Sequence, residues 1–510
     1  MKKQLKKLVL FMMTTVFSCS AFGCSVFSDF IKPSSKPTNA PTTNLSVPVF
    51  TEDKSYMIFA DVPTRPTVEH LQVYKDAGFT HYNMTEDWLK LTNVDNVYGT
   101  ADDGVLNPEY LKALEACETV GIEVVIRNYY GDSDYFLNDS EDADRDRLSE
   151  APWYNPYRMP RRSITTQLTE YNAVDGYYMG DEPSYQRIST FEKLINWYNA
   201  YGSKSNFTED DSLWHLNLLQ SYGADYFKGY SYEEYVDHYC DVVLEKVKGA
   251  KTLGTDYYPL VKGDIGEPNY IKVGLLSDYF VIANKTKEMI KEGHDVRTNF
   301  CIQSYENPKS VAGQVRELVS QADITFQTNL AMAFGTKSFQ YYTYKGYGSE
   351  PGIVDSSSLK PTKMYPWVQE ANRQAQVLAD IILNFNWQGA KVYQGQQRTD
   401  AYNMEAFADV EKYELDKFAL IGDVTARLDT VVSEFKDANG NFGYMFVNYS
   451  EPSLQLSGKA IVNFSSFINK AVVYVDGEKS VIDVKDNKLV LDLSAGGSVF
   501  LYPYYEGGAK

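Results

Sequence analysis

The chain has 510 residues, a formal net charge of −19 and 14% aromatic residues, with 41 tyrosines against 6 tryptophans. That length exceeds one ordinary core and fits a barrel of roughly 250 to 350 residues with a second domain. The acidic balance argues against nucleic acid and anionic membrane surfaces as partners, because both need basic patches.

The first 50 residues predict an export signal and a tether. Residues 1–24 have a basic start, an apolar run too short to span a membrane, and small residues before a cysteine. The Ala-Phe-Gly-Cys run that ends at Cys24 resembles a bacterial lipobox, and Cys19 is a second candidate for lipidation. Residues 25–50, rich in Pro, Ser, Thr and Asn, predict a flexible tether. We expect secretion across the cytoplasmic membrane and a lipid anchor at the bacterial cell surface.

Residues 51–390 alternate short apolar runs with amphipathic segments, which predicts βα units around a parallel sheet. The expected strands lie at residues 56–61, 79–84, 122–129, 173–180, 213–219, 252–257, 298–303 and 337–344. Helices are expected between them, including 185–201, 272–292 and 311–322. The predicted fold class is α/β, a (β/α)8 TIM barrel. The long polar and aromatic segment at 130–162 is expected to be a rim loop.

Residues 391–510 have a different character. Short runs of alternating polarity are separated by turn signals, among them Asn439-Gly440 and Asp476-Gly477. This pattern predicts a small all-β sandwich domain after the barrel.

The five cysteines and five histidines give no sign of a disulfide framework or a metal site. Three cysteines lie outside the leader, far apart in apolar contexts, and an odd number cannot complete a disulfide framework. The histidines show no paired spacing with one another or with the cysteines. We therefore predict buried thiols, no metal and no cofactor.

Acidic residues recur at the predicted carboxyl ends of strands, where a barrel carries its chemistry. Glycoside hydrolysis with retention needs two carboxyl groups about 5 to 5.5 Å apart, one protonated and one ionised. The acidic candidates are Asp181, Glu182, Asp256 and Glu306. The first two could instead serve the helix that follows, as a cap and a first-turn acid.

Other predicted strand-end side chains could contact a sugar through hydrogen bonds or ring stacking. The candidates for substrate contact are Asp181, Arg127, Asn128, Tyr257, Gln303, Tyr305 and Tyr341. Core packing is an equal alternative for the tyrosines, and a structural ion pair is an equal alternative for the arginine.

The Gly-Asp-Glu-Pro sequence at 180–183 resembles the Asn-Glu-Pro that ends the fourth strand in many clan A glycoside hydrolases. The resemblance implies that Glu182 is the general acid/base and that the nucleophile is a glutamate after strand seven, where Glu306 is the available acid. A barrel followed by a small β-sandwich also matches that clan's common plan. Two departures are Asp181 in place of asparagine and Gln303 at the strand-seven position. The second carboxylate is therefore Glu306, Asp256 or absent.

These features predict a surface-anchored glycoside hydrolase that cleaves O-glycosidic bonds of an oligo- or polysaccharide by a retaining two-carboxylate mechanism. The predicted partner is a carbohydrate, with the membrane reached only through the lipid anchor. The alternative is a catalytically inactive glycan-binding barrel lipoprotein, in which the second carboxylate has been lost.

Overall fold

The computed structural model describes residues 56–84, 108–127, 171–200, 212–262, 270–311, 314–346, 350–396 and 407–506. The predicted leader, tether and rim loop lie outside these residues. Every described element belongs to one compact unit within residues 44–510. None of the described helices is long and apolar enough to cross a membrane.

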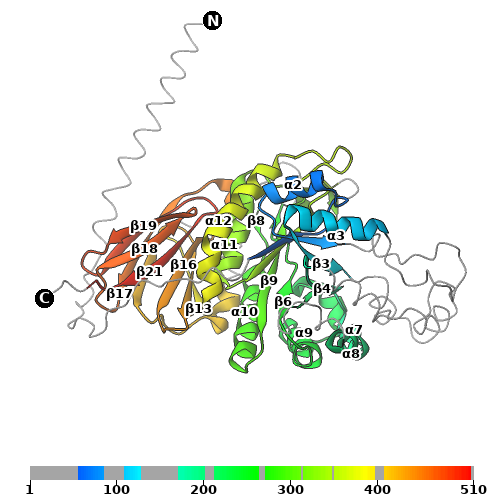
Figure 1. The fold of residues 1–510 in the computed structure, drawn as a ribbon. Coiled ribbons are helices and arrows are strands. Elements are labelled where there is room, and N and C mark those ends of the chain that lie inside the picture. Colours follow the sequence, from blue (N-terminus) through cyan, green and yellow to red (C-terminus); the bar gives the residue numbers. More distant parts are fainter. Residues whose placement is uncertain are drawn as a thin grey trace, which may run out of the picture. The chain divides into compact units, whose positions relative to one another are not determined.

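Eight parallel strands form the predicted barrel (Figure 1). They are β1 (Met57–Ala60), β2 (His81–Met84), β3 (Glu123–Arg127), β4 (Val174–Asp181), β5 (Leu213–Asn217), β6 (Lys251–Thr255), β9 (Val296–Gln303) and β12 (Ser338–Tyr342). Their order in the sheet is β1-β12-β9-β6-β5-β4-β3-β2, so β1 and β2 meet after one circuit. The backbone N–H of Thr80 donates to the carbonyl of Ile58 at 3.0 Å across this seam. The predicted (β/α)8 fold is confirmed.

Helices lie outside the sheet (Figure 1). They are α2 (Val68–Asp76), α3 (Pro108–Val120), α7 (Tyr185–Ile188), α8 (Glu192–Ala200), α9 (Tyr232–Tyr239), α10 (Leu275–Lys291), α11 (Gln321–Ala333) and α12 (Met364–Asn384). Shorter helical turns are η4 (Ser221–Phe227), η5 (Cys240–Leu244), η6 (Glu411–Tyr413) and η7 (Pro452–Leu454). The single helix expected over 185–201 is divided into α7 and α8.

The helix expected over residues 311–322 is wrong. An antiparallel hairpin follows each of the strands β6 and β9. The first pairs β7 (Leu260–Val261) with β8 (Tyr270–Ile271), and the second pairs β10 (Asn307–Val311) with β11 (Gln314–Arg316). Backbone hydrogen bonds of 2.9 and 3.0 Å between Lys262 and Val315 tie the hairpins together. Helix α11 starts only after Ser320, which forms a capping box with Asp323.

Antiparallel sheets follow the barrel, as predicted. The strands are β13 (Phe385–Tyr393), β14 (Ile421–Ala426), β15 (Thr430–Asp437), β16 (Phe442–Asn448), β17 (Gly458–Phe464), β18 (Lys470–Val475), β19 (Glu478–Asp483), β20 (Lys488–Leu493) and β21 (Ser498–Tyr504). Six of them pair in the order β13-β15-β16-β21-β18-β19, and three in the order β14-β17-β20. The hairpin from β18 to β19 turns at Asp476 and Gly477, both with positive φ, 49° and 79°.

The central strands of the six-stranded sheet are buried on both faces. In β16, Met445 belongs to the core shared with the barrel helices, while Tyr444 and Phe446 belong to the core shared with the three-stranded sheet. In β21 the same alternation places Phe500 in the first core and Leu501 in the second. A strand turns successive side chains to opposite faces, so one sheet serves both layers.

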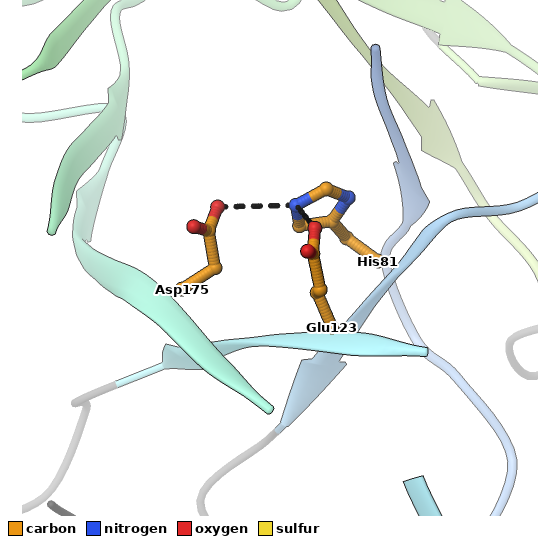
Figure 2. Close-up of side chains that lie close together, drawn as sticks. All are labelled: His81, Glu123 and Asp175. Carbon is orange, nitrogen blue, oxygen red and sulfur yellow. Dashed lines mark hydrogen bonds and ion pairs between the residues drawn. The ribbon is translucent and has the colours of Figure 1, made fainter. Parts of the chain in front are cut away.

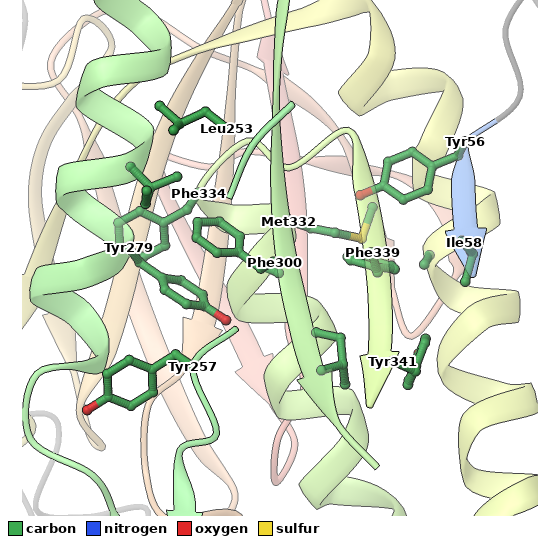
Figure 3. Packing of buried hydrophobic residues seen from close by; sticks show 14 of the residues in the cluster. Tyr56, Ile58, Leu253, Tyr257, Tyr279, Phe300, Met332, Phe334, Phe339 and Tyr341 are labelled. Carbon is green, nitrogen blue, oxygen red and sulfur yellow. The ribbon is translucent and has the colours of Figure 1, made fainter. Parts of the chain in front are cut away.

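Aromatic side chains fill the layer between the barrel sheet and its helices (Figure 3). Tyr279 of α10 stacks on Phe300 of β9 with ring centroids 3.7 Å apart, and Phe334 meets Tyr279 edge-on at 5.6 Å. A separate buried cluster, drawn from four of the strands and the residue before β6, comprises Met57, Phe59, Val125, Tyr178, Leu213 and Ala250. Because the barrel interior is packed in this way, the carboxyl ends of the strands are left to carry a site.

Candidate active site

Glu182 stands immediately after β4 in an uncommon backbone conformation. Its φ is 46°, in the left-handed region that residues other than glycine seldom adopt. Its N–H donates to the carbonyl of Asn217 at the end of β5, at 3.0 Å. The next carbonyl, that of Pro183, accepts a 2.6 Å hydrogen bond from the hydroxyl of Tyr235. The surrounding structure thus holds a strained turn, an arrangement that recurs at functional sites.

Asp256 lies directly after β6, and its carboxyl lies within hydrogen-bonding reach of that of Glu182. Asp256 is buried, whereas Glu182 is exposed. Burial raises the pKa of Asp256 well above its usual range, and the negative charge of Glu182 and the hydrogen bond to it add to the effect. Loss of water around its carboxyl also raises the pKa of Glu182, although the hydrogen bond with Asp256 opposes that change. Of the two groups, Asp256 is therefore the one whose surroundings more strongly favour the protonated form.

Asp181 sits beside the pair and is held from inside the barrel. The hydroxyl of Tyr178 donates to its Oδ1 at 2.8 Å, and the amide of Asn217 donates to that hydroxyl at 2.9 Å. Asp181 also adds its negative charge to the raised pKa of both Glu182 and Asp256. These contacts make Asp181 a neighbour of the carboxyl pair, and Ser184 is the residue that caps α7.

Three tyrosines from neighbouring strand ends form a cluster of edge-to-face rings. Tyr258 lies 5.4 Å from Tyr305 and 5.6 Å from Tyr342, and the last two lie 5.2 Å apart between ring centroids. The guanidinium of Arg316, from the β10–β11 hairpin, is 5.4 Å from the Tyr258 ring and 5.1 Å from the Tyr305 ring. The hydroxyl of Tyr258 donates to Oδ2 of Asp256 at 3.4 Å, which joins this cluster to the carboxyl pair.

A second cation, Lys272, lies directly after β8. The ammonium of Lys272 is 3.4 Å from the ring centroid of Tyr222, which meets Tyr257 edge-on at 5.2 Å. Burial raises the pKa of Tyr222, the charges of Asp256 and Glu182 raise it further, and Arg316 lowers it. The two carboxyl groups and the arginine therefore all lie close enough to Tyr222 for their charges to shift its pKa. Sequence reasoning missed Arg316, Lys272 and Tyr222, since the first lay in a predicted helix and the others carried no motif.

Glu306 is engaged away from Glu182. Its Oε1 accepts hydrogen bonds from the backbone N–H of Leu318 at 3.0 Å and from the ammonium of Lys363 at 2.8 Å. These bonds fix the loop after β9 to the segment before α11 and to the start of α12. The structure brings Asp256, and not Glu306, into contact with Glu182.

Three predicted substrate contacts have structural partners instead. The Gln303 amide exchanges two 3.0 Å hydrogen bonds with the backbone N–H and carbonyl of Leu260. Tyr257 donates to the carbonyl of Val273 at 2.7 Å, and Tyr341 donates to Asn372 of α12 at 2.7 Å. Figure 3 shows both tyrosines within the packed core.

Those placements correct the predicted roles of Gln303, Tyr257 and Tyr341, because each polar group is satisfied inside the protein. Tyr305 keeps a place in the ring cluster near the pair. Only the backbone of Arg127 is described, and Asn128, Cys19 and Cys24 lie outside the described residues.

One group of described residues has the composition of a metal site, at the opposite ends of the strands (Figure 2). His81 opens β2, and its Nε2 lies 2.8 Å from a carboxylate oxygen of Glu123 and 3.1 Å from one of Asp175. Burial lowers the pKa of His81, but the hydrogen bonds to Asp175 and Glu123 outweigh it and raise the pKa to about 9. The imidazolium is thus itself the cation between the two carboxylates, and a metal ion would have to displace its proton.

Comparison with known proteins adds little to this geometry. No family model matches the chain, and no curated protein matches it. A solved structure described as a glycoside hydrolase is 10% identical, covers 88% of this chain and 92% of its own, and has a TM-score of 0.47. A GH27 β-L-arabinopyranosidase from Geobacillus stearothermophilus is 11% identical, with coverages of 89% and 97% and a TM-score of 0.46.

A GH30 endoxylanase from Clostridium papyrosolvens C71 is 10% identical, covers 89% of this chain and 98% of its own, and has a TM-score of 0.42. At these identities and scores the three similarities assign neither a family nor an activity to the chain. The functional argument therefore rests on the residues at the carboxyl ends of the barrel strands.

Proposed function

We propose that the protein is a glycoside hydrolase and that Glu182 and Asp256 are its two catalytic carboxyl groups. The observation that carries the proposal is the close approach of these two carboxyl groups, which follow β4 and β6 at the end of a (β/α)8 barrel that carries chemistry. One protonated and one ionised carboxyl is the state that cleavage of a glycosidic bond requires.

Burial supports a specific division of roles. In the first step Asp256 gives its proton to the glycosidic oxygen, the carboxylate of Glu182 attacks the anomeric carbon, and the bond to the leaving sugar breaks. In the second step the carboxylate of Asp256 takes a proton from water, whose oxygen displaces Glu182 from the anomeric carbon. This reverses the role that the clan A resemblance implied for Glu182, because Asp256 is the buried group that holds the proton.

The closeness of the two groups supports retention of configuration. An inverting enzyme keeps its carboxyl groups about 6.5 to 9.5 Å apart so that a water molecule fits between sugar and base, whereas a retaining enzyme keeps them about 5 to 5.5 Å apart. Carboxyl groups as close as Glu182 and Asp256 fit the shorter, retaining separation better than the inverting one. We also propose secretion and lipid anchoring at the cell surface, for which the support is the leader sequence alone.

Hydrolysis of a panel of aryl glycosides tests the proposal. We expect Glu182→Gln and Asp256→Asn each to lower kcat/KM on the order of 10³-fold or more. Glu306→Gln is the matched control, since its carboxyl binds Lys363 and not the pair. Loss of activity in Glu306→Gln with survival in Asp256→Asn would contradict the assignment, and glycan binding without turnover would favour the inactive binding protein.

Azide rescue distinguishes the roles within the pair. In Glu182→Ala, azide can attack from the vacated side of the sugar, so we expect a glycosyl azide of inverted configuration. In Asp256→Ala, azide can attack the glycosyl-enzyme that Glu182 still forms, so we expect retained configuration, best seen with a good leaving group. The opposite pattern would restore Glu182 as the acid/base.

A further inference from the structure

Two cations near the carboxyl pair have no acidic partner. The chain carries 68 acidic and 49 basic residues, so carboxylates are abundant. Among the described residues, however, neither Arg316 nor Lys272 forms an ion pair, and the contacts found for both charged groups are with tyrosine rings. Both residues are half-buried, which makes an unsatisfied charge costly.

Arg316 is held in place by its backbone and not by its charge. Its neighbour Val315 pairs with Lys262 through two backbone hydrogen bonds, and the ammonium of Lys262 binds Glu317. Glu350 is the acid within electrostatic reach of Arg316, yet its carboxylate accepts from the Asn307 amide at 3.1 Å. Among the described residues, therefore, no carboxylate accepts from the donors of this guanidinium.

Lys272 is in a similar state. Its ammonium rests over the Tyr222 ring, and burial lowers its pKa to about 8, with the charge of Arg316 contributing. Asp278 lies within electrostatic reach, but its Oδ2 accepts the backbone N–H of Ser221 at 2.8 Å. An arriving anion would be attracted by both cations at once and would raise the pKa of the lysine.

Both cations belong to the same side of the site as Asp256. The Tyr258 ring carries Arg316 on its face, and its hydroxyl donates to Asp256. The Tyr222 ring carries Lys272 and feels the charges of Asp256, Glu182 and Arg316. A sugar bound at the pair would thus present one edge to the two cations and their tyrosines.

Building on the proposed glycosidase, we infer that its substrate is an acidic glycan whose anionic substituent, a carboxylate or a sulfate ester, binds Arg316 and Lys272. The planar fork of arginine suits either group, and charge-assisted hydrogen bonds in a half-buried cleft are strong. The anion also brings negative charge toward Asp256, which favours the protonated form that the first step needs.

Matched glycosides test the inference. We would compare the p-nitrophenyl glucuronide with the glucoside, the galacturonide with the galactoside, and 6-sulfated with unsulfated sugars, using the full chain. The wild-type protein should favour one acidic series, and Arg316→Gln should reduce the ratio of acidic to neutral kcat/KM by roughly 10- to 100-fold. Lys272→Gln should act in the same direction, and Arg316→Lys should retain part of the preference. Arg297→Gln, at the start of β9, removes a charge at the other end of the strand and should change nothing.

The same pairs, titrated calorimetrically into Glu182→Gln, separate this inference from the proposed activity. Acidic sugars that bind through Arg316 without turnover by the wild type would support the anion site and overturn the glycosidase. Turnover of neutral glycosides with no advantage for their acidic partners would support the glycosidase and overturn the anion site. Thermal unfolding of each variant shows whether a lost preference reflects lost folding, and unchanged preference in both Arg316→Gln and Lys272→Gln also overturns the inference.

Discussion

Glu182 and Asp256 are costly residues for the fold. Glu182 adopts a left-handed φ, and Asp256 places an acid where burial and two neighbouring carboxylates oppose its ionisation. A carboxyl whose pKa is raised by folding binds its proton more tightly in the native state. Stability is therefore lost as the pH rises above the unfolded value of about 3.9 toward the folded pKa.

Removal of one charge of this pair should stabilise the protein. In Glu182→Gln the pKa of Asp256 should fall, so the native state should be more stable than wild type at pH 7, on the order of 1 kcal/mol. The gain should shrink at pH 4, where Asp256 is protonated in both proteins. Urea unfolding at both pH values checks this expectation, and a variant that is less stable at pH 7 would show that the pair is not a source of strain.

At the scale of elements, the barrel strands were predictable and their loops were not. Apolar runs such as 213–219 read as strands because both faces of a barrel strand are buried, and all eight were found. The segment 311–322 read as a helix because Val315 and Leu318 are buried at helical spacing, although the chain forms a hairpin there. Arg316 was hidden by that error.

The partner of Glu182 in the carboxyl pair was also not predictable from the sequence alone. The sequence placed Glu182 and Asp256 after their strands, since a proline or turn follows each apolar run. It could not rank Asp256 above Glu306, because the choice depends on long-range contacts. Lys363, far along the chain in sequence, is what draws Glu306 to the start of α12.

The triad of His81, Glu123 and Asp175 joins the starts of β2, β3 and β4 and should make stability depend on pH. The folded pKa of His81 is about 9 against an ordinary value of 6.5. Its contribution is therefore complete below pH 6.5 and is lost as the pH rises through 9. Relative to His81→Gln, the wild type should lose roughly 2 kcal/mol over this window, after allowance for the half-exposed Glu123.

Urea unfolding of both proteins from pH 6 to 10 provides the measurement. If the stabilities of the two proteins change with pH in parallel, the folded state does not bind the His81 proton more tightly than the unfolded state does. Addition of Zn²⁺ or a chelator should leave the melting temperature unchanged at neutral pH. Stabilisation by Zn²⁺ that disappears in His81→Gln would instead assign the triad to a metal.

At the scale of the whole described unit, one core continues from the barrel helices into the β domain. Phe435, Met445 and Phe500 of the six-stranded sheet belong to the same buried cluster as the barrel side chains. Phe385 and Trp387 extend that cluster along β13, directly after α12. A shared core of this kind predicts that the barrel and the sandwich unfold together, as one cooperative unit.

Asn329 of α11 is the residue through which this coupling can be tested. Its amide donates to the carbonyl of Gly496 at 3.0 Å, and its Oδ1 accepts from the Ser498 hydroxyl at 2.9 Å, all in a buried setting. Asn329→Ala leaves both groups of the β domain unsatisfied and should cost roughly 2 to 4 kcal/mol. The exposed Asn386→Ala on β13 should cost little.

Because the lost bonds join the two domains, Asn329→Ala should also change how they unfold. The wild type should show one transition by calorimetry, with equal van't Hoff and calorimetric enthalpies. The variant should show a lower midpoint and a broader transition if the contact transmits stability between the domains. Two separate transitions already present in the wild type would mean that the continuous core does not couple the domains, and the barrel could then lose its β domain without losing its fold.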